Sequence, residues 1–190
     1  MCTPESGSPG MLERLRKGFT VDDVARTAAA AREAGLPMLW SFLFGGPGEC
    51  EETVRETLAF MERGLGLQDR ILCTLGLRIY PGTELERIAR EEGALEPGAD
   101  LAEPTFYFSP QIAPERVLAL LDGSRRRAQM LHLEALQRPF ISWWLRVQAA
   151  LGLPGPPWRH VPLYNRVARG RRRPIGAFNA ADSAARRSRH

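Results

Sequence analysis

The stretch LPMLWSFLFGGPGE, residues 36–49, decides the fold class of this chain of 190 residues. After Pro37, the segment Met38–Phe44 is an apolar run that lacks the regular polar alternation of a strand facing water on one side. Such a run predicts a strand buried on both faces, as in a parallel sheet covered by helices. The glycine-rich turn at 45–48 ends the strand, and three glutamates mark the first turn of a following helix, where the helix dipole favours negative charge: Glu49, Glu51 and Glu52.

Two helices are predicted upstream of this strand. ESGS at 5–8 leads into the first, with Ser8 as N-cap and Pro9 at the first helical position, and this helix closes at Gly18. Thr20 and Asp23 have the spacing of a capping box for the second helix, which runs to Gly35.

Downstream, the pattern alternates again between helix and strand. A helix is predicted from near Cys50 to Gly64, and the apolar segment Ile71–Tyr80 is predicted to be one strand. Thr83 and Glu86 then have capping-box spacing for a helix that ends before Gly93. Alternation of this kind predicts an α/β fold built from βαβ units, whose functional loops follow the carboxyl ends of the strands. Here those loops are ESGS, GGPGE and YPGT.

The remainder of the chain differs in character, and we divide the sequence into residues 1–96, 97–151 and 152–190. Residues 97–151 read as a connector followed by a helical extension, Glu115–Leu151, interrupted at Gly123 and Pro139. Residues 152–190 are rich in Pro, Gly and Arg and are predicted to be disordered.

Charge is unevenly distributed along the chain. The last 32 residues hold nine arginines and one acid, whereas the first 158 hold 17 bases and 21 acids, so the net charge of +4 belongs to the tail. We interpret the tail as solvated and expect no nucleic-acid partner. Phe140, Trp143 and Trp144 give the 138–151 segment helical apolar spacing, which fits either packing on protein or weak contact with a membrane surface. Three cysteines, no signal peptide and no long apolar run lead us to expect a cytoplasmic protein.

The FGGPGE loop is a candidate ligand site, because a bare glycine backbone allows close approach and its amides can bind an anion or a ribose. It lacks both the Lys-Ser/Thr of a P-loop and the GxGxxG of a dinucleotide fold. Those two classes of nucleotide-binding protein are therefore not favoured.

Three segments in order, ESGSPGMLERLRKGFTVDDV, AGLPMLWSFLFGGPGE and LGLRIYPGTELERIAREEG, resemble the second half of the barrel of radical S-adenosylmethionine (SAM) enzymes. In that family they correspond to the end of the fourth strand, the fifth strand with its GxxE, and the sixth strand. The resemblance covers residues 3–95 and is closest to the branch in which a cobalamin-binding domain precedes the barrel. It implies a partial (βα) barrel, made of the C-terminal βα units of a radical SAM-type TIM-like barrel, with a helical C-terminal extension.

The resemblance also implies an activity and its cofactors. The family cleaves SAM reductively at a [4Fe-4S] cluster and gives a 5′-deoxyadenosyl radical, and the cobalamin branch usually transfers methyl groups. The matched cofactor-binding positions here are Glu5, Ser6, Phe44, Gly45, Gly46, Glu49, Leu77 and Arg78, with Ile79 beside them. Glu5 and Ser6 would contact the ribose or methionine part of SAM, Phe44, Gly45 and Gly46 would line the adenine site, Glu49 would close the motif, and Leu77 and Arg78 would lie beside adenine or substrate. Structural alternatives remain for three of them: Ser6 holding the turn, Glu49 capping a helix and Arg78 pairing with an acid.

One departure from the family outweighs these matches. The family binds its cluster through a CxxxCxxC loop, and this sequence has none. With one strand over Ile71–Tyr80, Cys73 would lie about 20 Å from the strand end near Cys50, at about 3.3 Å per residue, and Cys2 would lie inside the preceding strand. The histidines, His132, His160 and His190, have no metal-ligand spacing, so no metal site is expected.

We therefore expect a truncated radical SAM protein that is inactive alone. It would use a cluster and cobalamin only if a missing N-terminal half, or another protein, supplied them. The alternative is a non-catalytic half-barrel module that binds a partner or a nucleotide.

Overall fold

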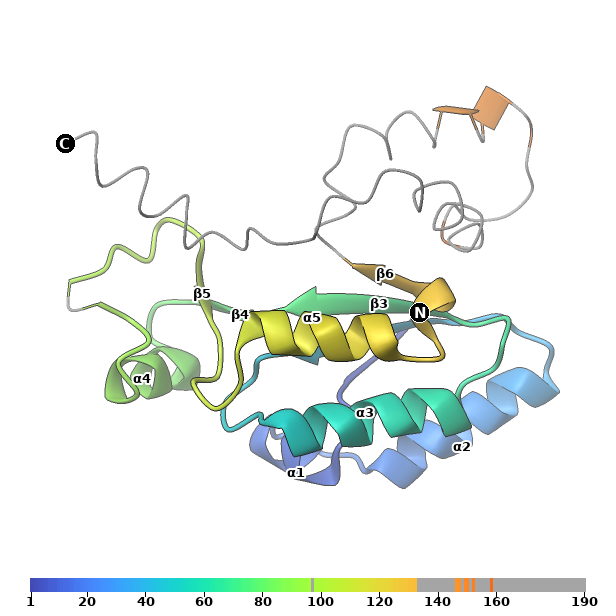
Figure 1. Cartoon of the computed structure of the whole chain (residues 1–190), viewed down its shortest axis with the longest axis horizontal. Helices are drawn as coiled ribbons and strands as arrows, with labels where there is room; N and C mark the ends of the chain where they lie inside the picture. Colours follow the sequence, from blue (N-terminus) through green and yellow to red (C-terminus); the bar gives the residue numbers. More distant parts are fainter. Residues whose placement is uncertain (97, 133–145, 148, 151, 153–157, 159–190) are drawn as a thin grey trace.

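The computed structural model describes residues 1–96 and 98–132, together with 146–147, 149–150, 152 and 158 (Figure 1). The strands are β1 (Cys2–Glu5), β2 (Leu39–Phe44), β3 (Arg70–Leu75), β4 (Leu77–Ile79), β5 (Thr105–Tyr107) and β6 (Met130–His132). The helices are α1 (Pro9–Arg14), α2 (Val21–Glu33), α3 (Glu51–Gly64), α4 (Glu84–Glu91) and α5 (Pro114–Gly123), with a short 3₁₀ turn at Arg127–Gln129.

The main sheet has four parallel strands in the order β1-β2-β3-β6. Side chains of α2, α3 and α5 pack with Trp40, Phe42 and Phe44 of β2 in one hydrophobic core, so the helices cover one face of the sheet (Figure 1). The alternate residues Ser41 and Leu43 remain half-buried on the other face. The α/β fold with a parallel sheet is confirmed, whereas the expected complete burial of the second strand holds for one face only.

The predicted single strand over Ile71–Tyr80 is wrong, because the chain breaks direction at Gly76. Gly76 has a φ of +75°, and its N–H donates to the carbonyl of Phe44 at 2.7 Å. Beyond it, β4 leaves the main sheet and pairs antiparallel with β5. We call this two-stranded element, Leu77–Ile79 with Thr105–Tyr107, the ribbon; its inner face packs on α4.

Of the predicted helical segment Glu115–Leu151, the part up to the expected interruption at Gly123 is confirmed as α5, whereas the continuation as a helix is wrong for residues 124–132; residues 146–147 and 149–150 are helical. After α5 the chain forms β6, which pairs in parallel with β3 through Ile71 with Met130 and Leu72 with Leu131. His132, expected on a helix, therefore lies in this strand. Short strands such as β5 and β6 carry too few residues to show a period. The expectations for Pro139, for the aromatic residues at 140–144 and for nearly all of 152–190 lie outside the described residues.

The predicted helix caps hold in part. Thr20 and Asp23 form the complete capping box, with Thr20 Oγ1 accepting from the Asp23 N–H at 3.2 Å and Asp23 Oδ2 accepting from the Thr20 N–H at 2.8 Å. Thr83 Oγ1 accepts from the Glu86 N–H at 3.3 Å, but the Glu86 carboxylate accepts from Gly82 N–H instead of completing the box. Ser8 is the N-cap residue of α1 without a capping bond from its side chain.

The described strands form an open sheet and not a closed barrel. Among the described helices, none combines the length and the hydropathy that a membrane crossing requires.

Candidate functional site

The glycine loop, residues 45–49, follows β2 at the carboxyl edge of the sheet and is organised by Glu49. Glu49 is fully buried, and its Oε2 accepts from the N–H groups of Gly45 and Gly46, the latter at 3.1 Å. The Glu49 N–H donates to the Gly46 carbonyl at 3.0 Å. Glu49 therefore holds the turn from inside the loop, ahead of α3, and is not the side-chain cap of that helix.

This arrangement disfavours the charged form of the Glu49 carboxyl group. Burial raises the pKa of its carboxyl group to about 7, against the lowering effect of the two backbone hydrogen bonds. Its second oxygen, Oε1, is buried and has no hydrogen-bond partner among the described residues. At neutral pH the carboxyl group is thus divided between its charged and neutral forms.

Protein side chains already fill the space beside both glycines. A Cβ built on Gly45 would lie 2.5 Å from Phe108, and Gly45 has a φ of +93°. A Cβ built on Gly46 would lie 2.9 Å from Met11. Ser109 fixes the contact, because its N–H donates to the Gly45 carbonyl at 2.9 Å and its hydroxyl to the Glu49 carbonyl at 2.8 Å. The glycines are needed here for close packing within the chain.

The ESGS turn is likewise bonded internally. The Ser6 hydroxyl is buried, shares a hydrogen bond of 3.0 Å with Thr57 Oγ1, and accepts from the Ser8 N–H at 3.1 Å. Thr57 also accepts from the Gly7 N–H at 3.1 Å, and the Ser8 hydroxyl donates to Glu56. These bonds anchor the turn to α3, which corresponds to the structural alternative for Ser6.

Glu5 differs from Ser6 because its carboxylate remains accessible. It is half-buried, adopts a φ of +69°, which is unusual for a residue with a side chain, and pairs with Lys17 at 3.1 Å. A left-handed backbone at this position turns the chain from β1 into the ESGS turn.

The remaining predicted positions divide between core and surface. Phe44 is fully buried in the core against the helices, and Ile79 is fully buried against α4. Leu77 is half-buried, and Arg78 is exposed with its guanidinium 4.8 Å from the centre of the Tyr80 ring. Their roles toward a cofactor stay predictions.

The three cysteines do not offer a cluster-binding donor set. Cys2 lies in β1, Cys50 is the N-cap residue of α3, and Cys73 is buried in the helix-side core, where burial raises its thiol pKa to about 12. Because β3 ends at Leu75, Cys73 is two residues from the end of its strand. The expected distance of about 20 Å between Cys73 and the strand end assumed one strand over Ile71–Tyr80 and is therefore wrong. Across the described residues, no three His, Cys, Asp or Glu side chains are grouped to hold a metal ion.

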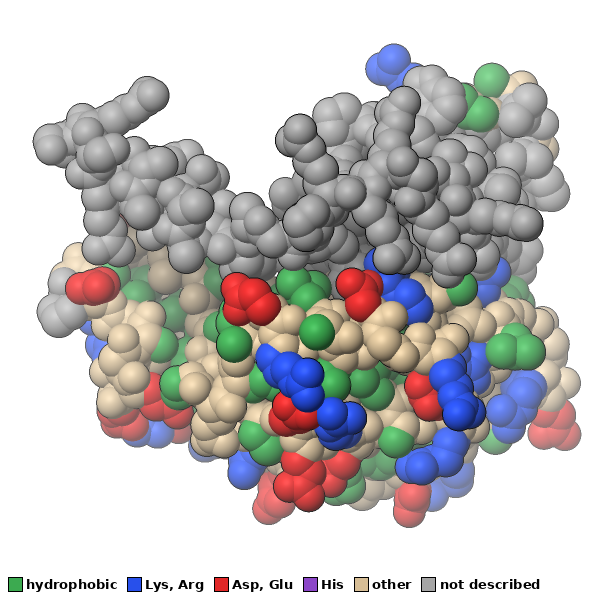
Figure 2. Space-filling view, in the orientation of Figure 1, with side chains coloured by type: hydrophobic (Ala, Val, Ile, Leu, Met, Phe, Trp, Pro, Cys, Tyr) green, Lys and Arg blue, Asp and Glu red, His purple; other side chains and the backbone are tan. Residues whose placement is uncertain are grey.

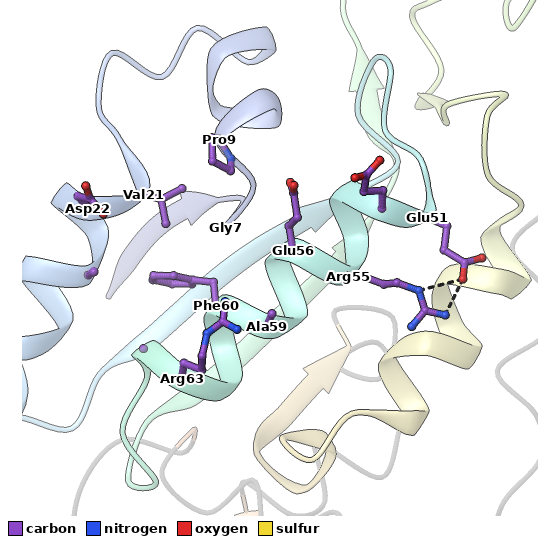
Figure 3. Close-up of a pocket in the computed structure, with 13 residues that line it drawn as sticks. Gly7, Pro9, Val21, Asp22, Glu51, Arg55, Glu56, Ala59, Phe60 and Arg63 are labelled. Atoms are coloured by element: carbon purple, nitrogen blue, oxygen red, sulfur yellow. Dashed lines mark hydrogen bonds and ion pairs between the residues drawn. The ribbon is translucent and has the colours of Figure 1, made fainter.

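A separate groove of about 900 Å³ lies on the helix side of the molecule, between α3 and the starts of α1 and α2 (Figure 3). Phe60 lies beside Gly7 on its inner side, and carboxylates line it at Asp22, Glu52 and Glu56. None of the eight predicted site residues lines it.

Residues that matter at this edge were missed by the sequence analysis, above all Thr57, Phe108 and Ser109. Thr57 lies mid-helix and Phe108 and Ser109 lie in the supposed connector, so no local pattern marked them. The one signal in the sequence is the cluster of aromatic residues in TFYFSP, an unusual composition for an exposed connector.

This open parallel sheet with its glycine–glutamate loop is similar to part of a solved radical SAM enzyme. No protein-family model and no curated sequence matches the chain. Solved structures do match, among them two of the cobalamin-binding radical SAM methyltransferase TsrM from Kitasatospora setae. The complex with cobalamin and a [4Fe-4S] cluster matches at TM-score 0.55 and 25% identity over 80% of this chain, and the complex with tryptophan and a SAM analogue at TM-score 0.56 and 23% identity over 82%.

The similarity to the cobalamin branch of the radical SAM enzymes is therefore confirmed at the level of structure. The chain spans about a third of the TsrM structures, 34% and 37% of their length.

Proposed function

We propose that this chain forms the second half of a radical SAM barrel and supplies the fourth to sixth strands of the SAM-binding wall. In this proposal the cluster ligands, and cobalamin where it is used, come from a polypeptide segment outside this sequence, joined to it or separate. The observation that carries the proposal is the match of 80% of the chain to one third of a cobalamin-binding radical SAM methyltransferase.

The sheet has the edges that such an assembly needs. Among the described strands, β1 pairs only with β2 and β6 only with β3, so these two strands lie at the ends of the strand order, where the further strands of a barrel would be added. Ser41 and Leu43 of β2 and Leu72 and Thr74 of β3 are half-buried on the face away from the helices, where a closed barrel would have its interior.

The residues of this chain fit the two implied cofactors differently. A [4Fe-4S] cluster in this family needs three converging thiolates, and Cys2, Cys50 and Cys73 lie on separate elements with Cys73 in the core. The cluster therefore does not fit this chain. SAM fits better, because Glu5 and Arg78 are accessible at the carboxyl edge and oppositely charged, as an amino acid with a carboxylate requires.

Two measurements test this proposal on the isolated chain. After anaerobic reconstitution with iron and sulfide, we expect no stoichiometric iron and no cluster absorption; a bound cluster that the triple replacement of Cys2, Cys50 and Cys73 by Ser removes would refute the proposal. Calorimetry with SAM should give weak binding that Glu5→Gln reduces and Glu33→Gln, an exposed change on α2, leaves unchanged.

The coding sequence of the assembly provides an independent check. A CxxxCxxC motif is expected in the sequence adjoining this chain, or in a protein that co-purifies with it. Its absence from both would favour the second candidate function.

That second candidate is a non-catalytic half-barrel that binds a partner protein or a nucleotide. The packing of Phe108 and Met11 against the two glycines favours it, because the direct approach to the glycine loop is already occupied. It predicts no SAM binding at all.

A further inference from the structure

The turns that lead into β2 and β3, at the amino edge of the sheet, present two leucines to solvent. Leu36 is 57% exposed and Leu67 is 80% exposed. Leu39 and Arg70 are paired in register, and each leucine precedes one member of that pair by three residues. The leucines therefore lie at the same level beyond the edge of the sheet. A single exposed leucine is ordinary, but two on adjacent turns at one level indicate a contact surface.

A buried carboxylate ties the two turns to each other. Asp69 is buried, and its Oδ1 accepts from the Met38 N–H at 2.9 Å while its Oδ2 accepts from the Gly66 N–H at 2.8 Å. The Arg70 N–H also donates to the Met38 carbonyl, at 2.8 Å. The relative position of the two turns is thus fixed by hydrogen bonds between them.

Side chains of the segment before β6 hold the turn of Leu67 as well. The buried guanidinium of Arg126 donates to the carbonyls of Leu65 and Gly66, the latter at 3.3 Å. Gln129 Nε2 donates to the Leu67 carbonyl at 3.1 Å. Because the backbone of this turn is bonded on several sides, the exposure of Leu67 is built into the fold.

Exposed arginines surround the two turns. Arg32 and Arg63 lie in the last turns of α2 and α3, and Arg125 follows α5, so all three are at the amino edge. Their side chains form no ion pair or hydrogen bond with another described residue, whereas Arg55 and Arg116 pair with a glutamate at 2.6 and 2.7 Å. Figure 2 shows blue and green side chains together at this end of the molecule, on the right of the view.

Acids at this edge offset the arginines only in part. Glu33 is exposed, and Glu62 accepts from the Arg125 N–H at 3.1 Å and from the Ser124 hydroxyl at 3.2 Å. Arginines outnumber acids among the described residues of the edge, with Arg32, Arg63, Arg70, Arg125, Arg126 and Arg127 against Glu33, Glu62, Asp69 and Asp122. The edge therefore carries a net positive charge around an apolar centre.

This combination identifies the kind of partner. A leucine that projects from a turn can enter the interfacial layer of a lipid bilayer without a matching pocket, and arginines beside it are attracted to acidic headgroups. The last 32 residues, with nine arginines and one acid, add a second source of attraction to an anionic surface. A nucleic acid would also attract the arginines but would leave the leucines in water.

We propose that the amino edge, with Leu36 and Leu67 at its centre, attaches this protein to an anionic lipid bilayer. The leucines enter the headgroup layer, and Arg63 and Arg125 contact lipid phosphates. In a parallel sheet the carboxyl edge is at the opposite end, so the proposed SAM wall faces away from the lipid. The attachment thus uses a surface that the proposed function does not use.

The test is flotation of the full chain with vesicles of phosphatidylcholine alone and of phosphatidylcholine and phosphatidylglycerol in equal amounts. Binding is expected to the anionic vesicles and to be much weaker to the neutral ones. The double variant Leu36→Ser, Leu67→Ser should weaken binding to anionic vesicles about tenfold. Leu67→Trp should strengthen it, because Trp favours the membrane interface. Tyr80→Ser, a change of an exposed apolar residue at the opposite edge, should leave it unchanged.

A pair of arginine variants tests the charge separately from the leucines. Arg63→Gln should weaken binding to anionic vesicles about fivefold at low salt. Arg16→Gln removes the same charge from a side chain that is 79% exposed and pairs with Glu84, away from the amino edge, and should have a smaller effect. Equal losses in the two variants would mean that only the net charge matters and would overturn the assignment to this edge.

Spin-labelled lipid in the anionic vesicles locates the contact. The NMR amide signals of residue 36 and of residues 66–68 should broaden first. Full affinity of the double leucine variant would overturn the proposal, since binding would then come from the tail or from the 138–151 segment. A dimer that this variant dissolves, without vesicle binding by the wild type, would assign the edge to a second copy of the chain and would equally overturn it. Because none of these measurements involves SAM or iron, their failure is distinct from failure of the proposed function.

Discussion

The glycine loop and the ribbon are neighbours at the carboxyl edge of the sheet, but the polar groups of the loop point inward, whereas Arg78 and Phe106 of the ribbon point outward. In the loop, Glu49 and the two glycines bond and pack inward, against backbone N–H groups, Phe108 and Met11. In the ribbon, Arg78 and Phe106 point outward from strands whose other side is buried. A glycine-rich loop indicates that something approaches the backbone closely, and here that neighbour is the protein itself.

The largest expected effect is that of a substitution at Gly45 in the glycine loop. Gly45→Ala puts a Cβ 2.5 Å from Phe108 on a backbone with a φ of +93°, so we expect a loss of about 3–5 kcal/mol in the free energy of unfolding. Urea unfolding measures it. Gly82→Ala is the matched control, since Gly82 has a φ of +74° with nothing within 4 Å, and it should cost about 1 kcal/mol.

Equal costs for the two glycine variants would mean that Phe108 does not constrain the loop. The double variant Gly45→Ala, Phe108→Ala sharpens the result, because truncating the ring removes the clash and should make the two changes strongly non-additive.

The charge inside the loop predicts a pH dependence of stability. Burial raises the pKa of Glu49 from 4.5 to about 7, so between these values the folded protein keeps a proton that the unfolded chain releases. The free energy of unfolding should therefore fall by about 2–3 kcal/mol as the pH rises from 5 to 8. Glu49→Gln removes this titration, and its stability should depend less on pH over the same range.

The quantity to compare is the difference between wild type and Glu49→Gln at each pH, because other groups titrate equally in both proteins. Glu33→Gln, an exposed change on α2, is the control. Parallel pH profiles for all three would show that Glu49 is solvated and the loop open.

The main sheet and its loops could be predicted from the sequence, whereas the ribbon could not. Continuous apolar runs and capping spacings gave β2, α2 and α3 correctly, because these elements are long enough for their periods to be visible. Gly76 is a single glycine within an apolar run, and only its backbone conformation separates β3 from β4. Strands of three residues, β5 and β6, are fixed by their long-range partners.

The candidate site shows the same limit. The sequence placed Glu49, Gly45 and Gly46 in one loop correctly, but the direction of their contacts depends on Phe108 and Ser109, about 60 residues later. A motif identifies the residues that form a loop, but it does not say whether a ligand or a distant segment of the chain packs against that loop.

The anchoring of the ESGS turn predicts a smaller effect. Thr57→Val leaves the Gly7 N–H without its acceptor in a buried environment and removes the partner of Ser6, so a loss of about 1–3 kcal/mol in the free energy of unfolding is expected. Thr27→Val, on the exposed side of α2, removes a hydroxyl that bonds only its own helix and should have little effect. Similar losses for both would mean that the bonds from Thr57 do not anchor the ESGS turn.

The smallest expected effect lies on the surface of the helix layer, where charges of both signs are interspersed over α3 and α5 (Figure 2). Glu51 accepts from Arg116 at 2.7 Å and from Arg55 at 2.6 Å, and these bonds lower its pKa to about 2. All three side chains are accessible to water, so Glu51→Gln should lower the melting temperature slightly, and only at low salt. Arg87→Gln, which breaks ion pairs within α4 alone, should behave similarly. A loss that persists in 1 M NaCl would instead mean that the ion pair between Glu51 of α3 and Arg116 of α5 positions the segment that leads to β6. This ion pair would then support the edge of the sheet more than the glycine loop or the ribbon does.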